Sequence, residues 1–434
     1  MESAIANVDL GRYRRIVQMF WDPEPTNDAT LDQPVWCLGC TYKLSDSSNQ
    51  PANSTDNQVT QRYPSSAVLR PPSPREPTKI VSPLPANAPE TPPESSSGSF
   101  SSSLAYDEPA QDGGGWPQGF HDDFASRFWM TYRSDFEPIP RSSDPKASSA
   151  LSLSMRIKSQ LVDQAGFSSD SGWGCMIRSG QSLLANAMAM LRLGRGWRRG
   201  ELQQDERQLV TLFADDPRAP YSIHNFVRHG AAACGKYPGE WFGPSATARC
   251  IQALVNSHEP SLRVYSTGDG PDVYEDSFMK IAKPDGGEFH PTLILMPQSV
   301  GIAGGRPSSS LYFVGAQGSF LFYLDPHHTR PALPYYSDKD RYTDDEIGSC
   351  HTSRLRRIHV REIDPSMLIG FLVRSEDDWL EWRRCVKHVQ GKAIIHVAES
   401  DPTTEGPTGQ RDAAVDEVEP LSDDDDDGDT VLAV

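Results

Sequence analysis

The chain has 434 residues and a formal net charge of −18 at neutral pH. The segment from Glu399 to Val434 contains thirteen acidic residues and one arginine, so it carries −12 and the 398 residues before it carry −6. A nearly neutral body excludes a protein that binds nucleic acid through a broad basic surface. Hydrophobic residues are only 37% of the chain, which indicates that part of it is disordered. Apolar runs such as Thr292 to Met296 are too short to cross a bilayer.

Residues 1–44 are expected to form an N-terminal helix followed by an extended segment. Apolar residues recur at three- and four-residue spacings from Asp9 to Trp21, which predicts an amphipathic helix, and the prolines that follow stop it. A short apolar stretch around Trp36 comes next. The first twenty residues lack the apolar core of a signal peptide.

The seven cysteines are irregularly spaced, which favours reduced thiols in the cytosol over a disulfide framework. Cys37 and Cys40 form a CxxC pair, but no second pair of cysteines or histidines follows at zinc-site spacing. We therefore expect no metal site and no cofactor, and a regulatory disulfide at this pair is the alternative.

Residues 45–115 differ in kind from the rest of the chain. Serine accounts for 15 of these 71 residues and proline for 12, and no helix or strand period is sustained. This Ser/Pro-rich segment is expected to be a disordered linker or insertion. Its Ser-Pro pairs at Ser73 and Ser82 are either phosphorylation sites or unmodified coil.

Residues 116–398 have the aromatic and aliphatic content of one packed domain, and residues 399–434 form an acidic, disordered tail. Helices and strands are expected without regular alternation, which predicts an α+β fold. The expected helices are Asp122 to Met130, Gly180 to Leu193, Ala246 to Asn256 and Asp377 to His388. The expected strands are Leu262 to Tyr265, Thr292 to Met296, Leu311 to Val314, Phe320 to Leu324 and Ala393 to Val397.

The strongest chemical signal is Cys175, which follows the turn Gly172-Trp173-Gly174 and opens a long predicted helix. A thiol in the first turn of a helix lies at the positive end of the helix dipole, which stabilises the nucleophilic thiolate. A buried structural cysteine is the competing interpretation, and it is about as probable on this context alone.

A nucleophilic thiolate needs a base, and the base needs a partner that orients it. Asp325 and His327 end the strand Phe320 to Leu324, and side chains two residues apart on an extended chain point to the same side. Asp325 could hold the His327 ring, or both could face the thiol. His328 is expected to point away, and a strand-end turn with an exposed histidine is the plainer alternative.

Two aromatic residues could complete the site. Tyr132 could donate its phenol to an oxyanion, although an aromatic in the core is the commoner case. Trp241 lies in a turn before a predicted helix and could cover a cleft, although a buried tryptophan is the default. Arg192, Arg195 and their neighbours to Arg199 form either a solvated helix end or a docking patch for an acidic partner.

Four motifs occur along the chain: SDSGWGCMIRSGQ around Cys175, WFGPS from Trp241, MPQSVGIAGGRPSSS from Met296 and YLDPH from Tyr323. In this order they resemble the autophagins, the autophagy-related cysteine peptidases, and the insertion and tail look like the fungal branch. The resemblance runs from the N-terminal helix to Trp382, apart from the Ser/Pro-rich segment.

The resemblance implies a papain-like α+β fold in which Cys175 is the nucleophile, His327 the base and Asp325 the residue that orients it. It also implies that Tyr132 stabilises the oxyanion. It implies further a substrate gate over the cleft, made by Trp241 together with Arg306, Pro307, Ser308 and Ser309.

The reaction implied by the resemblance is cleavage after the C-terminal glycine of a ubiquitin-like autophagy modifier. It acts first on the precursor and then on the phosphatidylethanolamine conjugate, which would be the only contact with a membrane. Nucleic acid is not an expected partner, and we expect a monomer. The expected location is the cytoplasm with recruitment to the preautophagosomal structure, with the nucleus as a further location.

The chain departs from the family at one place. In autophagins a loop and a helix separate the strand that corresponds to Thr292 to Leu295 from the MPQS motif, whereas here Leu295 is followed directly by Met296. The loss would join two elements that should be apart, so weak or absent activity is expected. The alternative functions are thus a modifier-binding protein that cuts poorly or not at all, and an acyl transferase that uses the same three residues.

Overall fold

The computed structural model describes residues 24–27, 33–43, 114–152, 155–156, 166–268, 270, 272–298, 309–363, 366–387 and 395–401. The chain divides into two units, Met1–Ser45 with Pro109–Val434, and Asp46–Glu108. The second unit and nearly all of the Ser/Pro-rich segment lie outside the described residues. The predicted N-terminal helix, Asp9 to Trp21, and the acidic tail beyond Asp401 lie outside them as well.

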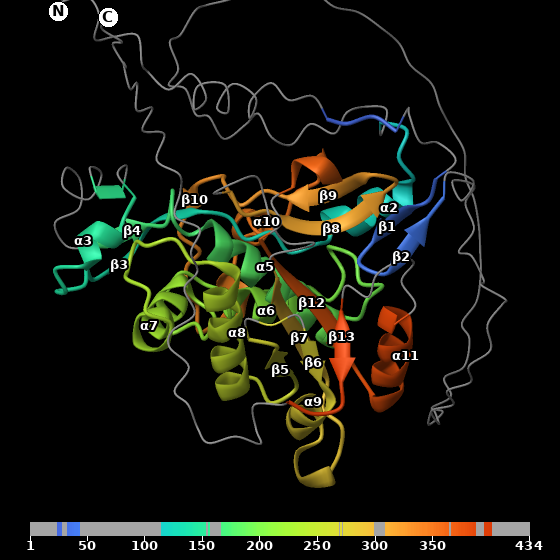
Figure 1. Cartoon of the computed structure of the whole chain (residues 1–434). Helices are drawn as coiled ribbons and strands as arrows, with labels where there is room; N and C mark the ends of the chain where they lie inside the picture. The colour runs from blue at the N-terminus through green and yellow to red at the C-terminus, as the bar shows by residue number, and fades with distance from the viewer. Residues whose placement is uncertain are drawn as a thin grey trace, which may run out of the picture. The chain divides into compact units, whose positions relative to one another are not determined.

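The larger unit is an α+β domain, as expected from the sequence (Figure 1). Its main helices are α2 (Gln118–Ala125), α5 (Cys175–Arg192), α6 (Gln203–Thr211), α7 (Ile223–Ala233), α8 (Pro244–His258), α9 (Glu275–Ala282) and α11 (Glu376–Lys387). Two short helices, α3 (Ala147–Ala150) and α10 (Asp344–Gly348), accompany them. Among the described residues, no helix is long and apolar enough to cross a membrane.

The strands among the described residues form four sheets. The largest has the order β11 (Arg357–His359), β9 (Phe320–Leu324), β8 (Tyr312–Gln317), β1 (Val35–Cys37) and β2 (Cys40–Tyr42). The others are β10 (Arg330–Pro331) with β3 (Arg133–Ile139) and β4 (Phe167–Ser169); β12 (Met367–Val373) with β7 (Thr292–Gln298) and β5 (Arg263–Ser266); and β13 (His396–Ala398) with β6 (Asp272–Tyr274).

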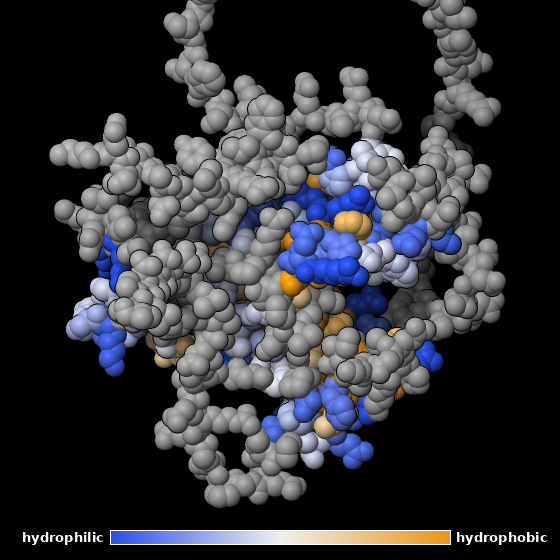
Figure 2. Space-filling view, turned by 45° about the horizontal axis from the view of Figure 1, so that its top comes forward, coloured by the Kyte–Doolittle hydropathy of each residue, from blue (hydrophilic) through white to orange (hydrophobic). Residues whose placement is uncertain are grey.

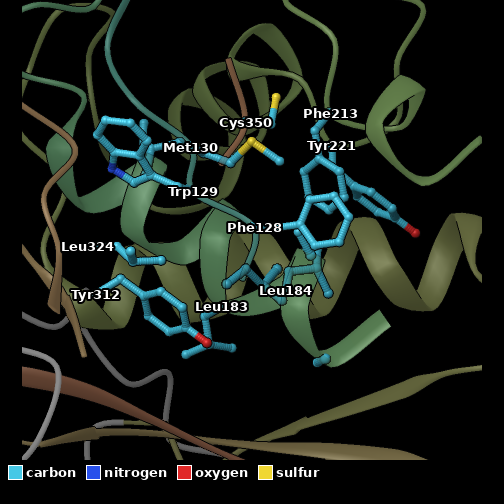
Figure 3. Packing of buried hydrophobic residues seen from close by; sticks show 14 of the residues in the cluster. Phe128, Trp129, Met130, Leu183, Leu184, Phe213, Tyr221, Tyr312, Leu324 and Cys350 are labelled. Atoms are coloured by element: carbon cyan, nitrogen blue, oxygen red, sulfur yellow. The ribbon is translucent and has the colours of Figure 1, made fainter. Parts of the chain in front are cut away.

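Helix α5 runs through the core and is buried on nearly all sides, since 15 of its 18 residues are buried. Small residues allow its neighbours to approach. A Cβ atom at Gly180 would lie 2.5 Å from the Cγ2 atom of Thr247 on α8, so only glycine fits this crossing. Figure 3 shows Leu183 and Leu184 of α5 among the aromatic and aliphatic side chains of the core. A helix this firmly held gives its first residue, Cys175, a fixed position.

Each element that was predicted between residues 116 and 398 has a counterpart among the described helices and strands. Helices α5, α8 and α11 include most of their predicted ranges, strand β9 has the predicted bounds, and β5, β7, β8 and β13 overlap their predictions. Helix α2 begins and ends earlier than predicted. Helices α6 and α7 and strand β12 were not predicted. Helix α6 is mostly polar and buries only four residues, so its apolar period is weak.

Leu295 and Met296 lie in one continuous strand, β7. It pairs antiparallel with β12 along all seven residues, from Thr292 opposite Val373 to Gln298 opposite Met367. The parallel partner β5 pairs only with the first part, Thr292 to Leu295. Both residues at the junction are fully buried. The MPQS motif therefore begins inside β7, in the same strand as Thr292 to Leu295.

The arginines that follow α5 are engaged in ion pairs within the domain. The fully buried carboxylate of Asp123 on α2 lies 3.0 Å from Arg127, 2.7 Å from Arg195 and 2.9 Å from Arg198. Arg195 also donates to the carbonyl oxygens at the end of β1. Arg192 pairs separately with Glu259. These three side chains are therefore paired within the domain, which argues against an open basic docking patch formed by them.

The described surface is mainly hydrophilic on the face drawn in Figure 2, with small apolar patches between polar residues. The large hydrophobic side chains that are most exposed come from separate parts of the chain: Trp36, Leu202, Val360 and Leu380.

Asp123→Asn is expected to lower the free energy of unfolding by about 3 kcal/mol, because it leaves three arginines around a neutral amide. Chemical denaturation measures this change. Asp122→Asn is the matched control, since this neighbouring side chain is exposed, and its effect should stay within about 0.5 kcal/mol. Equal effects of the two substitutions would contradict the role of Asp123.

Candidate active site

Cys175 is the first residue of α5, and its side chain is almost completely buried. The turn before it is held by Asp170, whose carbonyl oxygen accepts the Gly174 N–H at 2.9 Å. A Cβ atom on Gly174 would lie 2.4 Å from the Asp170 carboxylate, so glycine is required there. Gly172 has a φ of +97°, which also favours glycine. The two glycines of the motif therefore place the thiol at the positive end of the helix.

Asp325 and His327 follow β9 and are bonded to each other. The Nδ1 atom of His327 lies 2.6 Å from Oδ1 of Asp325, and the same oxygen accepts the His327 backbone N–H at 3.0 Å. Of the two arrangements that the sequence allowed, the structure has the one in which Asp325 holds the ring. With Nδ1 engaged, Nε2 is the nitrogen left for the thiol, and the His327 side chain hydrogen-bonds to Cys175.

Tyr132 directly precedes β3, and its backbone is hydrogen-bonded to the loop that carries His327. Its N–H donates to the carbonyl oxygen of Pro326 at 2.8 Å, and its ring meets the His327 ring edge-on with centroids 5.3 Å apart. Trp129 holds the same loop through a second hydrogen bond, in which its indole N–H donates to the Asp325 carbonyl oxygen at 2.7 Å. The phenol of Tyr132 is hydrogen-bonded to Cys175.

Trp241 precedes α8 and covers the thiol. Its indole N–H donates to the sulfur of Cys175, with Nε1 and Sγ 3.3 Å apart. The next residue, Phe242, is fully buried against Gly230 of α7, where a Cβ atom would lie 2.3 Å from the ring. Phe242 therefore fixes the chain next to Trp241, whose ring packs at the edge of the core beside the thiol.

The remaining residues of the expected gate are described only in part. Arg306, Pro307 and Ser308 lie outside the described residues, so their placement stays a prediction. The hydroxyl oxygen of Ser309 lies 3.2 Å from Nε2 of His327. The next residue, Ser310, donates its hydroxyl to Ser179 of α5 at 3.0 Å and is buried.

Comparison with known proteins shows the family of this chain. The family model described as the peptidase C54 catalytic domain matches residues 117–298 and 288–385. The chain belongs to the peptidase C54 family. It is 62% identical to the cysteine protease ATG4 of Gibberella zeae, over 98% of this chain and 99% of that protein. It is 58% identical to the cysteine protease ATG4 of Pyricularia oryzae over the full length of both chains. The chain is therefore a cysteine protease, and the resemblance to the autophagins is confirmed.

The C54 relatives contain residues that this chain lacks. The alignment with the Gibberella zeae protein extends over 475 positions, more than the 434 residues of this chain. The two stretches matched by the C54 model share residues 288–298, which include the junction between Leu295 and Met296. Both observations agree with the expected absence of a segment at this junction.

The ionisation of this C54 peptidase site favours a thiolate–imidazolium pair. Burial alone would raise the pKa of Cys175, but the hydrogen bond and charge of His327 outweigh it and lower that pKa. Burial alone would lower the pKa of His327, but its hydrogen bonds to Asp325 and Cys175 raise that pKa to about 10. Burial opposes ionisation of Asp325 too, yet the bond from His327 holds its pKa below the ordinary value. Both shifts favour a thiolate beside an imidazolium.

Tyr132 remains a neutral donor in this site. Burial first, and the neighbouring Cys175 second, raise the pKa of its phenol well above the ordinary value. The hydroxyl therefore keeps its proton over the whole working range and can donate it to a negative oxygen or sulfur.

His328 has a different environment from its neighbour. Its ring meets the Trp129 ring edge-on at 5.6 Å, and burial lowers its pKa to about 4. It stays uncharged at neutral pH. The structure therefore supports His327 as the base.

Beneath the site lies a group of buried charges that sequence reasoning missed. Arg178 of α5 pairs with Asp170 at 2.7 Å and with Asp215 at 2.8 Å, and Arg133 of β3 lies 4.0 Å from Asp215. Asp170 also accepts the Arg133 backbone N–H at 2.6 Å. All four side chains are at least 95% buried. The signal was present in the sequence, since Arg178 interrupts the apolar helix one turn after Cys175.

Within the described ranges, no group of three or more His, Cys, Asp or Glu side chains could hold a metal ion. Cys37 and Cys40 face each other across β1 and β2, and both thiols are free. Burial raises the pKa of Cys37 above its ordinary value, which makes it an unreactive thiol.

The pairing of Cys175 with His327 predicts how the reactivity of the thiol depends on pH. In the wild-type protein, alkylation of this thiol by iodoacetamide should proceed well below pH 9, its ordinary pKa. His327→Ala removes the cation and the hydrogen bond, so burial is unopposed and the apparent pKa should rise to 9 or above. The rate of modification of the Cys175 peptide, followed by mass spectrometry across pH, measures both values.

His328→Ala is the matched control for this experiment, since the two histidines are adjacent and only His327 contacts the thiol. Its apparent pKa should equal that of the wild type. An upward shift in His328→Ala without one in His327→Ala would move the base assignment by one residue.

Proposed function

We propose that this cysteine protease cleaves after the C-terminal glycine of a ubiquitin-like autophagy modifier, on both the precursor and the phosphatidylethanolamine conjugate. The observation that carries the proposal is the indole of Trp241 over the Cys175 thiol. A chain that reaches the sulfur must pass beneath an aromatic ring. Glycine suits such a passage, because it has no side chain and adopts the widest range of backbone angles.

The proposed first step is attack of the Cys175 thiolate on the carbonyl carbon of the terminal glycine. Negative charge develops on the carbonyl oxygen, and the Tyr132 hydroxyl is the donor proposed to stabilise it. His327 then gives its proton to the leaving amine, and a thioester links the modifier to Cys175. Asp325 keeps the ring oriented and stabilises its positive charge.

Water completes the reaction in the second step. His327, now neutral, takes a proton from the water that attacks the thioester, and the free carboxylate of the modifier leaves. The bond to phosphatidylethanolamine is an amide, as is the peptide bond of the precursor. The same residues therefore serve both substrates, and the enzyme meets a membrane only through its conjugated substrate.

The proposed gate consists of Trp241 and the loop Arg306 to Ser309. The described part of this segment contacts both the base and the helix of the nucleophile. Ser309 contacts His327, and Ser310 is hydrogen-bonded to α5. The incoming tail would displace the indole and the Ser309 hydroxyl. The protein is proposed to act as a monomer in the cytoplasm, with recruitment to the preautophagosomal structure and presence in the nucleus.

The proposal is tested by incubating the purified chain with a modifier precursor. The measured quantity is the release of the precursor's C-terminal extension as a separate peptide. Cleavage after glycine should be lost in Cys175→Ser, and His327→Ala should lower kcat at least a thousandfold. Mass spectrometry of the products identifies the cleaved bond. Persistent cleavage by Cys175→Ser would show that the nucleophile is another residue.

A second candidate function is a modifier-binding protein with weak or no activity. It is favoured by strand β7, which runs straight through the junction of Leu295 and Met296. Only residues 299–308 connect its last residue, Gln298, to Ser309 beside His327. The missing segment lies before this connection, so its loss would shift the start of the connection and restrict how far the gate can open.

Insertion of the missing segment separates the two candidates. The corresponding residues of the Gibberella zeae protein, placed between Leu295 and Met296, should raise kcat/KM for the precursor at least tenfold if their absence limits opening. Binding of the processed modifier, measured by calorimetry, should change much less. Equal kcat/KM for both chains would show that the segment is dispensable and would exclude the second candidate.

A further inference from the structure

We propose that Ser171 and Thr329 are positioning residues of this cysteine protease: the hydrogen bond between their hydroxyls, the hydroxyl bridge, sets how the loop of the nucleophile lies against the loop of the base. The two oxygens are 2.7 Å apart, although the residues are separated by 158 positions in the chain. Ser171 comes four residues before Cys175, and Thr329 comes two residues after His327. The hydroxyl bridge therefore joins the two loops directly, away from the reacting groups themselves.

On the side of the nucleophile, Ser171 belongs to a short row of hydroxyls that begins on β4. The hydroxyl of Ser169, the last residue of β4, donates to the Ser171 hydroxyl at 3.1 Å and accepts the Ser171 backbone N–H at 3.3 Å. Since the Ser171 oxygen accepts this bond, its own proton is available for Thr329. Ser169 lies opposite Ser134 in the pairing of β4 with β3. The row thus starts from a strand that is fixed in a sheet.

On the side of the base, Thr329 lies in a loop that the backbone of Tyr132 closes at both ends. The Tyr132 N–H donates to the Pro326 carbonyl oxygen at 2.8 Å, and the Tyr132 carbonyl oxygen accepts the Arg330 N–H at 2.9 Å. The base, His327, lies between these two bonds. Because the loop is short, a bond from Thr329 limits how far the loop can tilt away from the nucleophile.

The hydroxyl bridge is also next to the peptide group that holds the proposed oxyanion donor. The backbone N–H of Gly172, the residue after Ser171, is hydrogen-bonded to the Tyr132 hydroxyl. This N–H belongs to the peptide plane between Ser171 and Gly172, so movement of Ser171 would turn it away from the phenol. The hydroxyl bridge thus restrains the thiol, the imidazole and the phenol relative to one another.

The ionisation of the thiol reports the position of the base. The hydrogen bond and the charge of His327 are the largest contributions that lower the pKa of Cys175, and burial opposes them. Asp325 holds the ring from its other side. The backbone N–H of Ser310 and the indole of Trp241 also lower this pKa, but they come from elements that the hydroxyl bridge does not join. Loss of the hydroxyl bridge should therefore weaken the contribution of His327 and raise the pKa of the thiol.

The variants Ser171→Ala and Thr329→Val each remove one hydroxyl, and valine keeps the branched shape of threonine. Alkylation of Cys175 by iodoacetamide, followed across pH on the Cys175 peptide by mass spectrometry, needs no protein substrate. The hydroxyl bridge is exposed to solvent, where water competes for both hydroxyls, so we expect a modest rise of about half a unit in the apparent pKa of Cys175. An unchanged pKa in both variants would overturn the inference.

The double variant, Ser171→Ala with Thr329→Val, shows whether the two hydroxyls act as a pair. Its apparent pKa should equal that of either single variant, because the first substitution already breaks the bond. Shifts that add in the double variant would show two independent effects and would contradict a bridge.

Ser171→Thr is the conservative variant, since it keeps a hydroxyl, and its pKa should equal that of the wild type. A shift as large as that of Ser171→Ala would overturn the role of the hydroxyl. Ser257→Ala is the matched control, because the exposed Ser257 hydroxyl also makes a bond of 2.7 Å, to the Ala253 carbonyl oxygen within α8. An equal shift in this control would assign the effect to the loss of any surface hydroxyl. Thermal melts establish that each variant is folded.

Turnover of a modifier precursor is the second measurement, and it rests on the proposed function. In Ser171→Ala and in Thr329→Val, kcat should fall about three- to tenfold while KM stays within about twofold, because the hydroxyls align the reacting groups. A change confined to KM would assign the pair to substrate binding and would overturn a positioning role. A precursor that the wild type fails to cleave would count against the proposed function, while the alkylation result still decides the role of the hydroxyl bridge.

Discussion

The salt bridge between Arg178 and Asp170 organises the whole site, although neither side chain is proposed to touch substrate. Asp170 bonds to the β3 backbone, to the turn that presents Cys175 and to α5 itself. Two further charges, Asp215 and Arg133, complete a neutral group. Loss of one member would leave a buried charge without a partner, which costs several kcal/mol. Helix, turn and strand must therefore fold together or not at all.

The group of buried charges is connected to the base, His327, through the chain around Tyr132. Tyr132 is adjacent to Arg133, and its N–H is bonded to Pro326, which stands between Asp325 and His327. A displacement of β3 would thus move the phenol and the imidazole together and preserve their spacing. The nucleophile, the base and the proposed oxyanion donor form one rigid assembly. Trp241, in contrast, is only half-buried, which allows it to move without disturbing the rest.

Strand β7 shows that a regular sheet forms across the junction between Leu295 and Met296. The strand pairs with β12 in one unbroken register from Thr292 to Gln298, so the pairing continues across the junction. Burial of Leu295 and Met296 adds apolar stabilisation. A stable sheet is therefore compatible with a changed connection to the gate. A change at this junction can therefore affect activity without affecting the stability of the domain. Stability depends on strand β7, whereas activity depends on the loop that follows it.

The chain alone determined the features that depend on local spacing. Cys175 after two glycines, Asp325 two residues before His327, strand β9 and helix α5 could all be predicted, because their signals lie within one turn or one strand. The tertiary structure decided what distant segments do together. Trp241 bonds to a sulfur 66 residues away, and the buried charges come from four parts of the chain. Periodicity reports which face of an element is apolar, but it carries no information on which partner that face meets. Contact between distant residues depends on packing, and packing is a property of the folded domain.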